Sequence, residues 1–157
     1  EDAQVLRLVQ PFVGGRRAEV TGTPKVYLLD NGLRNALVGG FLPEDRRTDR
    51  GPLWENGVFT ELLKSLELLD EVRYWRSKNG AEVDFVVRRG ERLLAVEVKA
   101  GSMSRPRLSR AARSFIAAYR PELLAVVNGS LRLDTEVDGV PVAYVRPWEL
   151  PSLLTPS

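Results

Sequence analysis

The sequence predicts an α/β domain in which a central mixed sheet is flanked by helices. Apolar residues recur at helical spacing in two stretches, 52–69 and 106–119. Short runs rich in Val, Leu and aromatic residues, bounded by Gly, Asn or Pro, are typical of strands. Along the chain these elements follow the order helix, three strands, helix, strand, which predicts a sheet with helices packed on it.

The first third of the chain predicts short elements. Residues 1–24 alternate apolar runs with Gly- and Thr-containing turns and form a lead-in segment. Residues 25–30 are typical of a buried strand. A short helix follows, which Asp30 or Asn31 caps and which Gly39 and Gly40 end. Residues 41–51 are charged and predict a loop.

The main helices and strands lie between residues 52 and 145. The first long helix is expected over 52–69, with Pro52 in its first turn, and strands are expected over 72–76, 82–88 and 93–99. A second long helix begins near Pro106 and ends at Pro121, and its apolar stripe includes Phe115 and Tyr119. Strands over 123–127 and 140–145 follow. We expect a single domain over residues 1–157, with a core over 25–146 and a proline-containing tail over 147–157.

Composition excludes several kinds of catalytic site. The 157 residues contain no Cys and no His, so thiolate nucleophiles, zinc sites of the usual kind and histidine general bases are absent. A formal net charge of +2 does not by itself indicate a nucleic-acid partner. No long apolar run and no secretory signal pattern occur, so we expect a cytoplasmic protein without membrane association.

Residues 82–99 predict a β-hairpin that gathers charge on one face. A two-residue loop at Gly90 and Glu91 suits a type II′ turn and sets the register. Asp84 then lies opposite Glu97, and Glu82 lies opposite Lys99. In this register the other face is uniformly apolar and belongs to the core; it carries Val83, Phe85, Val87, Leu94, Val96 and Val98.

The acidic face of this hairpin has two interpretations. Like charges placed directly opposite each other cost up to about 1 kcal/mol, so Asp84 facing Glu97 favours a cation between them, and a divalent metal held by oxygen ligands meets that need. Alternatively, the face is solvated and its acids are neutralised by Lys99 and Arg88. Glu82 is either a salt-bridge partner of Lys99 or a further ligand. A register shifted by one residue would scatter the whole group.

Glu55 shares a helical stripe with apolar residues of the first long helix. The stripe continues through Phe59, Leu62 and Leu66, so we expect the Glu55 side chain to point toward the sheet. Alternatively, Glu55 occupies this position only because a negative charge in the first turn of a helix is stabilising.

Several ordered motifs together resemble known families. GAEVDFVV (80–87) followed by LLAVEVKAG (93–101) resembles the Asp and Glu-x-Lys elements of the PD-(D/E)XK nuclease superfamily. More narrowly, PKVYLLDNGLRNALVG (24–39), LWENGVFTELL (53–63) and YWRSKNGAEVDFVV (74–87) resemble the domain of unknown function that follows the ATPase module in prokaryotic AAA-type ATPases. This resemblance implies a restriction-endonuclease-like αβββαβ core and a C-terminal place in a longer ATPase.

The resemblance also implies a catalytic site. Asp84, Glu97 and the Val98 carbonyl would hold Mg²⁺ or Mn²⁺, Glu55 would complete the site through water, and Lys99 would orient the attacking water. The implied function is phosphodiester hydrolysis of a nucleic acid. A non-catalytic module that binds nucleic acid or protein on the same fold is the alternative.

Basic residues near these motifs predict a track for a phosphate backbone. Four arginines are expected on the second long helix, and two basic residues precede the acidic strand. A solvated charged face is the competing explanation. The residues are Arg105, Arg107, Arg110, Arg113, Arg76 and Lys78.

Overall fold

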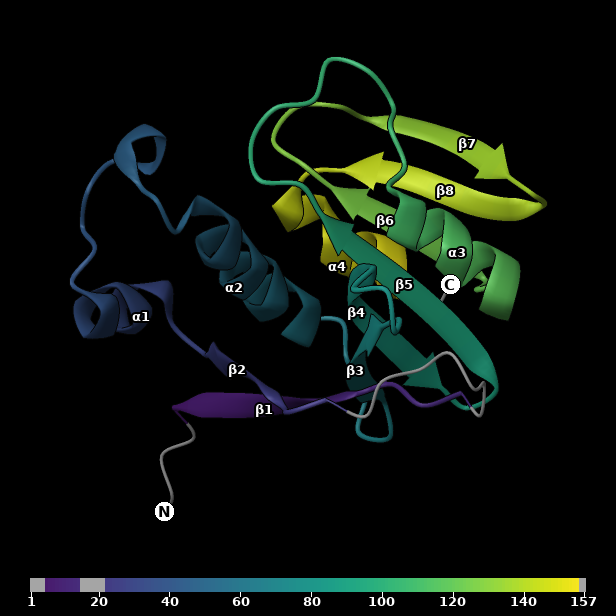
Figure 1. The fold of residues 1–157 in the computed structure, drawn as a ribbon, viewed down its shortest axis with the longest axis horizontal. Coiled ribbons are helices and arrows are strands. Elements are labelled where there is room, and N and C mark those ends of the chain that lie inside the picture. The colour runs from purple at the N-terminus through teal and green to yellow at the C-terminus, as the bar shows by residue number, and fades with distance from the viewer. Residues whose placement is uncertain (1–4, 15–21, 156–157) are drawn as a thin grey trace.

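The computed structural model describes residues 5–14 and 22–155, and it contains one eight-stranded mixed sheet (Figure 1). The strands lie in the order β2-β1-β3-β4-β5-β6-β8-β7. Their bounds are β1 Leu6–Pro11, β2 Lys25–Leu28, β3 Glu71–Arg76, β4 Glu82–Arg89, β5 Arg92–Val98, β6 Leu123–Val127, β7 Leu133–Val137 and β8 Val140–Val145. The helices are α1 Asn31–Val38, α2 Arg50–Leu63, α3 Arg110–Tyr119 and α4 Leu150–Leu154, with short 3₁₀ turns at Glu44–Arg46 and Pro147–Glu149.

This architecture confirms the predicted α/β class. The run α2-β3-β4-β5-α3-β6 reproduces the expected order of helices and strands. The predicted caps of α1 are also present: the Asp30 side chain accepts a hydrogen bond of 2.7 Å from the Leu33 N–H, and Gly39 ends the helix with φ +67°. Within the described residues, no helix is both long and apolar enough to cross a membrane.

Both long helices are shorter than predicted. The helix α2 ends at Leu63, and the next residues form a turn in which Leu68 and Leu69 are 98% and 87% exposed. Leu69 therefore fits the helical spacing by coincidence. The helix α3 begins at Arg110, four residues after Pro106, because the Ser109 side chain caps it by accepting a bond from the Ala112 N–H.

Two strands were not predicted. The strand β1 lies in the lead-in segment, where it pairs with β2 and β3. The strand β7 pairs with β8 through a two-residue turn, Asp138-Gly139, in which both residues have positive φ. An Asp-Gly pair between strand-forming residues is a strong hairpin signal, so β7 was detectable from the sequence.

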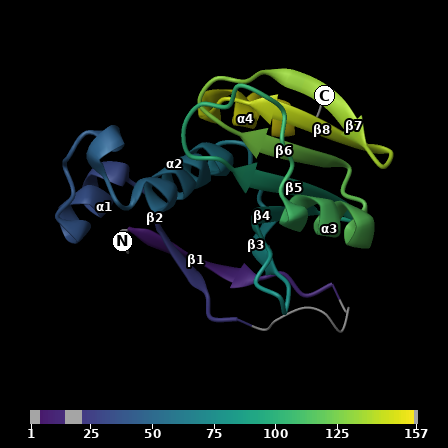
Figure 2. The ribbon, with the colours of Figure 1, turned by 45° about the horizontal axis from the view of Figure 1, so that its top comes forward.

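Helices cover both faces of the sheet (Figure 2). One face packs against α3 in a cluster that includes Val83, Val86, Ala95 and Phe115. The opposite face packs against α2 and α4 in a cluster whose members include Phe59, Phe85, Val96 and Leu150. We call these two surfaces the α3 face and the α2 face.

A β-bulge interrupts strand β4. Arg73 pairs with Val86 and Trp75 pairs with Val83, so Tyr74 alone lies opposite two residues of β4, Asp84 and Phe85. The extra residue breaks the simple alternation of side chains. Val83 and Val86 accordingly both lie on the α3 face, although they are three positions apart.

Candidate functional site

The hairpin that was expected to carry the site has the predicted register. Val86 pairs with Ala95 and Arg89 pairs with Arg92, which leaves Gly90 and Glu91 as the loop. Gly90 has φ +59°, the conformation that favours glycine at the first position of such a turn. The turn chemistry alone therefore positioned β4 against β5 correctly.

The bulge nevertheless separates the two acids that were expected to share a face. The neighbours of Glu97 in the sequence, Val96 and Val98, pack on the α2 face, so the Glu97 side chain projects to the α3 face. Asp84 instead turns toward β5 and the α2 face. The expectation of Asp84 and Glu97 side by side on one face is therefore wrong, because it assumed unbroken alternation along β4.

Asp84 lies in crowded acidic surroundings on the α2 face. Its Oδ2 accepts a hydrogen bond of 2.7 Å from the Val98 N–H and so anchors the carboxylate to β5. Burial raises the pKa of Asp84 to about 7, and the negative charge of Glu55 adds to the rise, while the Val98 N–H and Lys25 oppose it. Asp84 therefore changes charge near neutral pH in the absence of a further cation.

Glu55 points toward the sheet, as its helical stripe predicted. Its Oε2 accepts hydrogen bonds of 3.2 Å from the Tyr27 hydroxyl and 3.4 Å from Lys25 Nζ, both on β2. The side chain is 28% exposed, so it stays accessible from solvent. Burial raises the pKa of Tyr27, and the adjacent Glu55 charge raises it further, so this hydroxyl keeps its proton and remains a donor.

Glu82 is not paired with Lys99. Lys25 Nζ hydrogen-bonds to its Oε1, and Arg76 Nε donates to its Oε2 over 2.6 Å. Lys25 and Tyr27 were not among the residues predicted to belong to the site. The sequence does indicate that these two residues share a face, because they lie two positions apart on one strand. Their proximity to Glu55 and Glu82, however, depends on the tertiary fold.

Glu97 and Lys99 form a second group, on the α3 face. Glu97 is 2% exposed, and its Oε1 forms an ion pair of 2.5 Å with Lys99 Nζ. Its buried Oε2 has no hydrogen-bond partner among the described residues. Burial raises the pKa of Tyr144, and the charge of Glu97 raises it further, which indicates that the two side chains are close. A buried carboxylate oxygen without a partner is rare and favours a ligand or a proton there.

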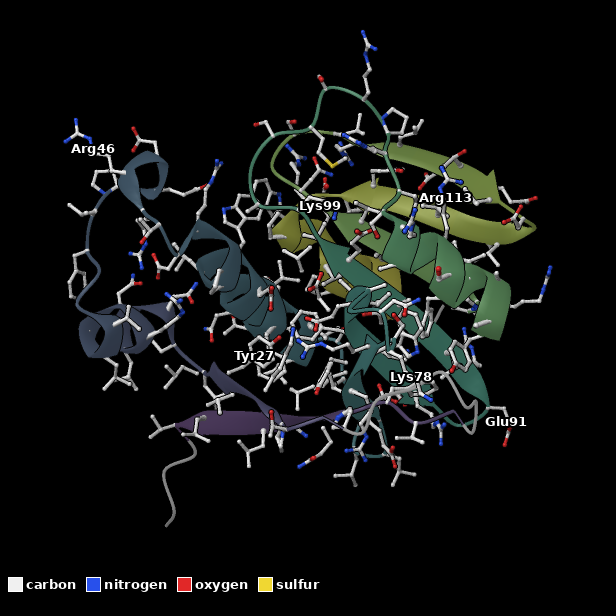
Figure 3. The ribbon with its side chains drawn as sticks, in the orientation of Figure 1. Tyr27, Arg46, Lys78, Glu91, Lys99 and Arg113 are labelled. Atoms are coloured by element: carbon white, nitrogen blue, oxygen red, sulfur yellow. The ribbon has the colours of Figure 1, made fainter. Side chains whose placement is uncertain are left out.

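The predicted phosphate track is divided between two places. Lys99 and Arg107 line one hollow of about 380 Å³ together with Met103 and Ser109, at the start of α3. Figure 3 shows Arg113 on α3 on the same side of the molecule as Lys99, and Lys78 well away from both. Arg105 and Arg110 are exposed near the N-terminal end of α3. Arg76, by contrast, is paired with Glu82.

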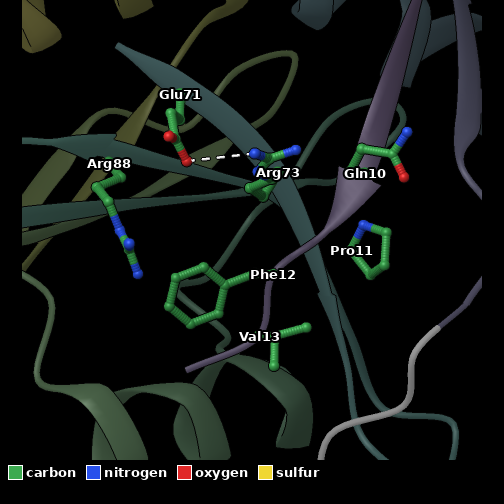
Figure 4. Close-up of a pocket in the computed structure, with 7 residues that line it drawn as sticks. All are labelled: Gln10, Pro11, Phe12, Val13, Glu71, Arg73 and Arg88. Atoms are coloured by element: carbon green, nitrogen blue, oxygen red, sulfur yellow. Dashed lines mark hydrogen bonds and ion pairs between the residues drawn. The ribbon is translucent and has the colours of Figure 1, made fainter. Parts of the chain in front are cut away.

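Another hollow, of about 350 Å³, lies where β1 leaves β3 (Figure 4). Phe12 and Arg88 stack there with 5.5 Å between the guanidinium carbon and the ring centre. Arg73 and Glu71 form an ion pair of 3.3 Å within it. None of the predicted site residues lines this hollow. It is therefore separate from the candidate site.

Asn56 holds β2, and with it Lys25 and Tyr27, against α2. It is 3% exposed, accepts a bond of 2.8 Å from the Leu28 N–H and donates one of 2.9 Å to the Leu28 carbonyl. Its Nδ2 also donates to Asn31 Oδ1 over 2.8 Å. The Asn56 side-chain amide thus hydrogen-bonds to both the N–H and the C=O of Leu28 on β2.

Replacing Asn56 is expected to weaken this attachment. Asn56→Ala leaves the buried polar groups of Leu28 without their partner, and we expect a loss of about 1–3 kcal/mol in the free energy of unfolding. Urea denaturation measures the loss. Asn79→Ala, in the exposed β3–β4 turn, is the control and should change stability by less than about 0.5 kcal/mol. Equal effects of the two substitutions would contradict the role of Asn56.

The chemistry of the donors suits a hard divalent cation. Asp84, Glu55 and the Val98 carbonyl offer only oxygen ligands. The Oε2 of Glu97, which has no hydrogen-bond partner among the described residues, is a further oxygen that a cation or a proton would stabilise. Across the described part of the chain, however, no three acidic side chains converge in a ready-made metal cluster. The residues fit Mg²⁺ or Mn²⁺ by donor type.

The fold and the site define an α/β domain whose bulged β-hairpin bears carboxylates and a lysine. The chain belongs to the family described as Domain of unknown function (DUF4143), whose model matches residues 50–147. This confirms the expected membership in a class of domains of unknown function.

The chain is similar to three bacterial proteins that are described as uncharacterized. It is 32% identical over 128 residues to an uncharacterized protein of Mycobacterium bovis and, equally, to one of Mycobacterium tuberculosis. It is 26% identical over 126 residues to an uncharacterized protein of Haemophilus influenzae. Each match covers 80% of this chain and 28% of the relative, so the chain spans less than a third of the length of these relatives.

Proposed function

We propose that this domain is a Mg²⁺-dependent nuclease module that hydrolyses phosphodiester bonds of nucleic acid. The observation that carries the proposal is the buried carboxylate of Glu97. Its Oε1 pairs with Lys99, whereas its Oε2 has no hydrogen-bond partner among the described residues. On the neighbouring strand, the Asp84 carboxylate is bound to the backbone N–H of Val98, the residue between Glu97 and Lys99. A hard cation and a phosphate would meet the needs of these groups.

Each residue has a role in this proposal. Asp84, Glu97 and the Val98 carbonyl would hold the metal ion, and Glu55 would contribute through water. Because the Asp84 and Glu97 carboxylates project to different faces in the metal-free chain, binding would turn them toward one ion. When bound, such an ion would lower the pKa of a water molecule and offset negative charge at the phosphate. Lys99 donates to the attacking water or to a phosphate oxygen, and Arg107, which shares a hollow with it, attracts the phosphate backbone.

Cleavage of labelled single- and double-stranded DNA and RNA with Mg²⁺ or Mn²⁺ tests this function. We expect metal-dependent cleavage by the native chain and its loss in both Asp84→Asn and Lys99→Ala. Glu122→Gln, which alters an exposed acid paired with Arg92, is the control and should leave the rate unchanged. Cleavage that persists in both site variants would contradict the assignment.

A second candidate function is a non-catalytic module that binds nucleic acid on the same fold. Two observations favour it: Lys25 already pairs with Glu55 and Glu82 on the α2 face, and Asp84 and Glu97 project to different faces. Nucleic-acid binding without cleavage, unaffected by Asp84→Asn and weakened by Arg107→Ala, would support this function over the nuclease.

The mycobacterial relatives are more than three times as long as the region that matches this chain. We propose that the domain operates within a longer chain that includes an ATPase module, as the resemblance of residues 24–39, 53–63 and 74–87 implies. ATP hydrolysis by that chain, altered by nucleic acid, would be the expected result.

A further inference from the structure

Lys25 occupies the middle of the acidic cluster on the α2 face. Its ammonium contacts Oε1 of Glu82 and lies 3.4 Å from Oε2 of Glu55. It also lies 5.3 Å from the centre of the Tyr74 ring. The side chain is only 20% exposed, so the ammonium is held by these groups rather than by bulk water.

Acids outnumber cations around Lys25. Glu82 and Glu55 contact its ammonium, and Asp84 lies near enough to act on it through its charge. The cluster contains these three acids against Lys25 and Arg76, and the Arg76 side chain is 46% exposed. Lys25 is therefore the more buried of the two cations that compensate the acids.

The position of Lys25 also limits how Glu55 can act as a ligand. Oε2 of Glu55 accepts hydrogen bonds from both Lys25 and Tyr27. A divalent cation beside Glu55 and Asp84 would lie close to the ammonium, and two cations at such short distances repel each other strongly where water is scarce. Metal and ammonium thus compete for the same carboxylates.

We propose that the Lys25 ammonium is the resident counter-ion of the Glu55, Glu82 and Asp84 cluster, and that it weakens the binding of divalent metal by competing for these acids. The inference rests on the metal site of the proposed function and adds a residue that restrains it. In the metal-free chain Lys25 stabilises the cluster, and metal binding requires it to withdraw from Glu55.

Titration calorimetry with Mn²⁺ alone tests this competition. Lys25→Met removes the charge but keeps much of the apolar stem, and we expect its affinity for Mn²⁺ to rise by about tenfold or more. Lys25→Arg keeps the charge and should bind metal as weakly as the native chain. Lys64→Met, at the exposed end of α2 where Lys64 pairs with Glu61, is the control and should change nothing.

A second variant guards against loss of folding. If Lys25→Met does not fold, Lys25→Gln, which retains polarity, takes its place, and the same tenfold rise is expected. Adding Asp84→Asn to either variant should remove the gained affinity, which places the metal at this cluster.

The outcomes separate this inference from the proposed function. Unchanged or weaker Mn²⁺ binding in the Lys25 variants, with binding lost in Asp84→Asn alone, would overturn the role of Lys25 and leave the metal site intact. Tighter binding in the Lys25 variants without any cleavage would support Lys25 and contradict the nuclease. Absence of Mn²⁺ binding in every variant would overturn both.

Discussion

Asp84→Asn is expected to raise the free energy of unfolding at pH 8 by on the order of 3 kcal/mol, and to have almost no effect at pH 4. The folded chain holds the Asp84 proton up to a pH of about 7, whereas the ordinary value is 3.8. Between these two pH values the folded state binds more protons than the unfolded state, so stability falls as the pH rises. Asparagine avoids this penalty and still accepts the hydrogen bond from Val98.

Urea denaturation of both chains from pH 4 to pH 8, without divalent metal, measures this effect. Asp134→Asn, on the exposed strand β7, is the matched control and should shift stability by less than about 0.5 kcal/mol at either pH. Equal or lower stability of Asp84→Asn at pH 8 would show that the ionised carboxylate is well compensated. The expected gain means that the ionised Asp84 carboxylate lowers the stability of the metal-free chain.

Arg89→Met is expected to lower the free energy of unfolding by about 3–5 kcal/mol at pH 7. Arg89 pairs with Asp70 over 2.6 Å, and the side chain of Asp70 is only 2% exposed. The guanidinium also donates to the carbonyls of Leu154 over 2.8 Å and Ser65 over 3.0 Å. Loss of Arg89 leaves a buried carboxylate without a cation and two carbonyls without donors. The turn after α2 and the end of α4 then lose a common attachment to β4.

The loss should depend on pH in a defined direction. The hydrogen bonds from Arg89 lower the pKa of Asp70, so the pair stabilises the native chain above the ordinary pKa of aspartate and this contribution is lost as the pH falls through the lowered value. Arg92→Met, which breaks an exposed pair with Glu122, is the control, and we expect a change below about 1 kcal/mol. Similar losses for Arg89→Met and Arg92→Met would contradict the special role of the buried pair.

Local sequence rules predicted the features that depend on neighbours along the chain. The Asp30 cap, the Gly39 end of α1 and the Gly90 turn follow from side-chain chemistry within a few residues, and all were confirmed. The helical stripe also oriented Glu55 correctly, because its spacing is set by the helix itself.

Features that depend on distant partners were not predicted. The bulge at Asp84 arises where β4 meets Tyr74 of β3, and nothing in residues 82–88 alone indicates it. Lys25 and Glu82 are 57 residues apart, and only the sheet order brings them together. The sequence therefore predicted most of the chemical groups of the candidate site but not which face of the sheet each one occupies.

The amide of Asn56 has a consequence for association between chains. The strand β2 is the last strand of the sheet on its side, and such an edge exposes N–H and C=O groups that can pair with a strand from another molecule. Asn56 engages both groups of Leu28 just as a neighbouring strand would. The same side chain that fixes Lys25 and Tyr27 beside the acids thus blocks edge-to-edge aggregation at this point of the sheet.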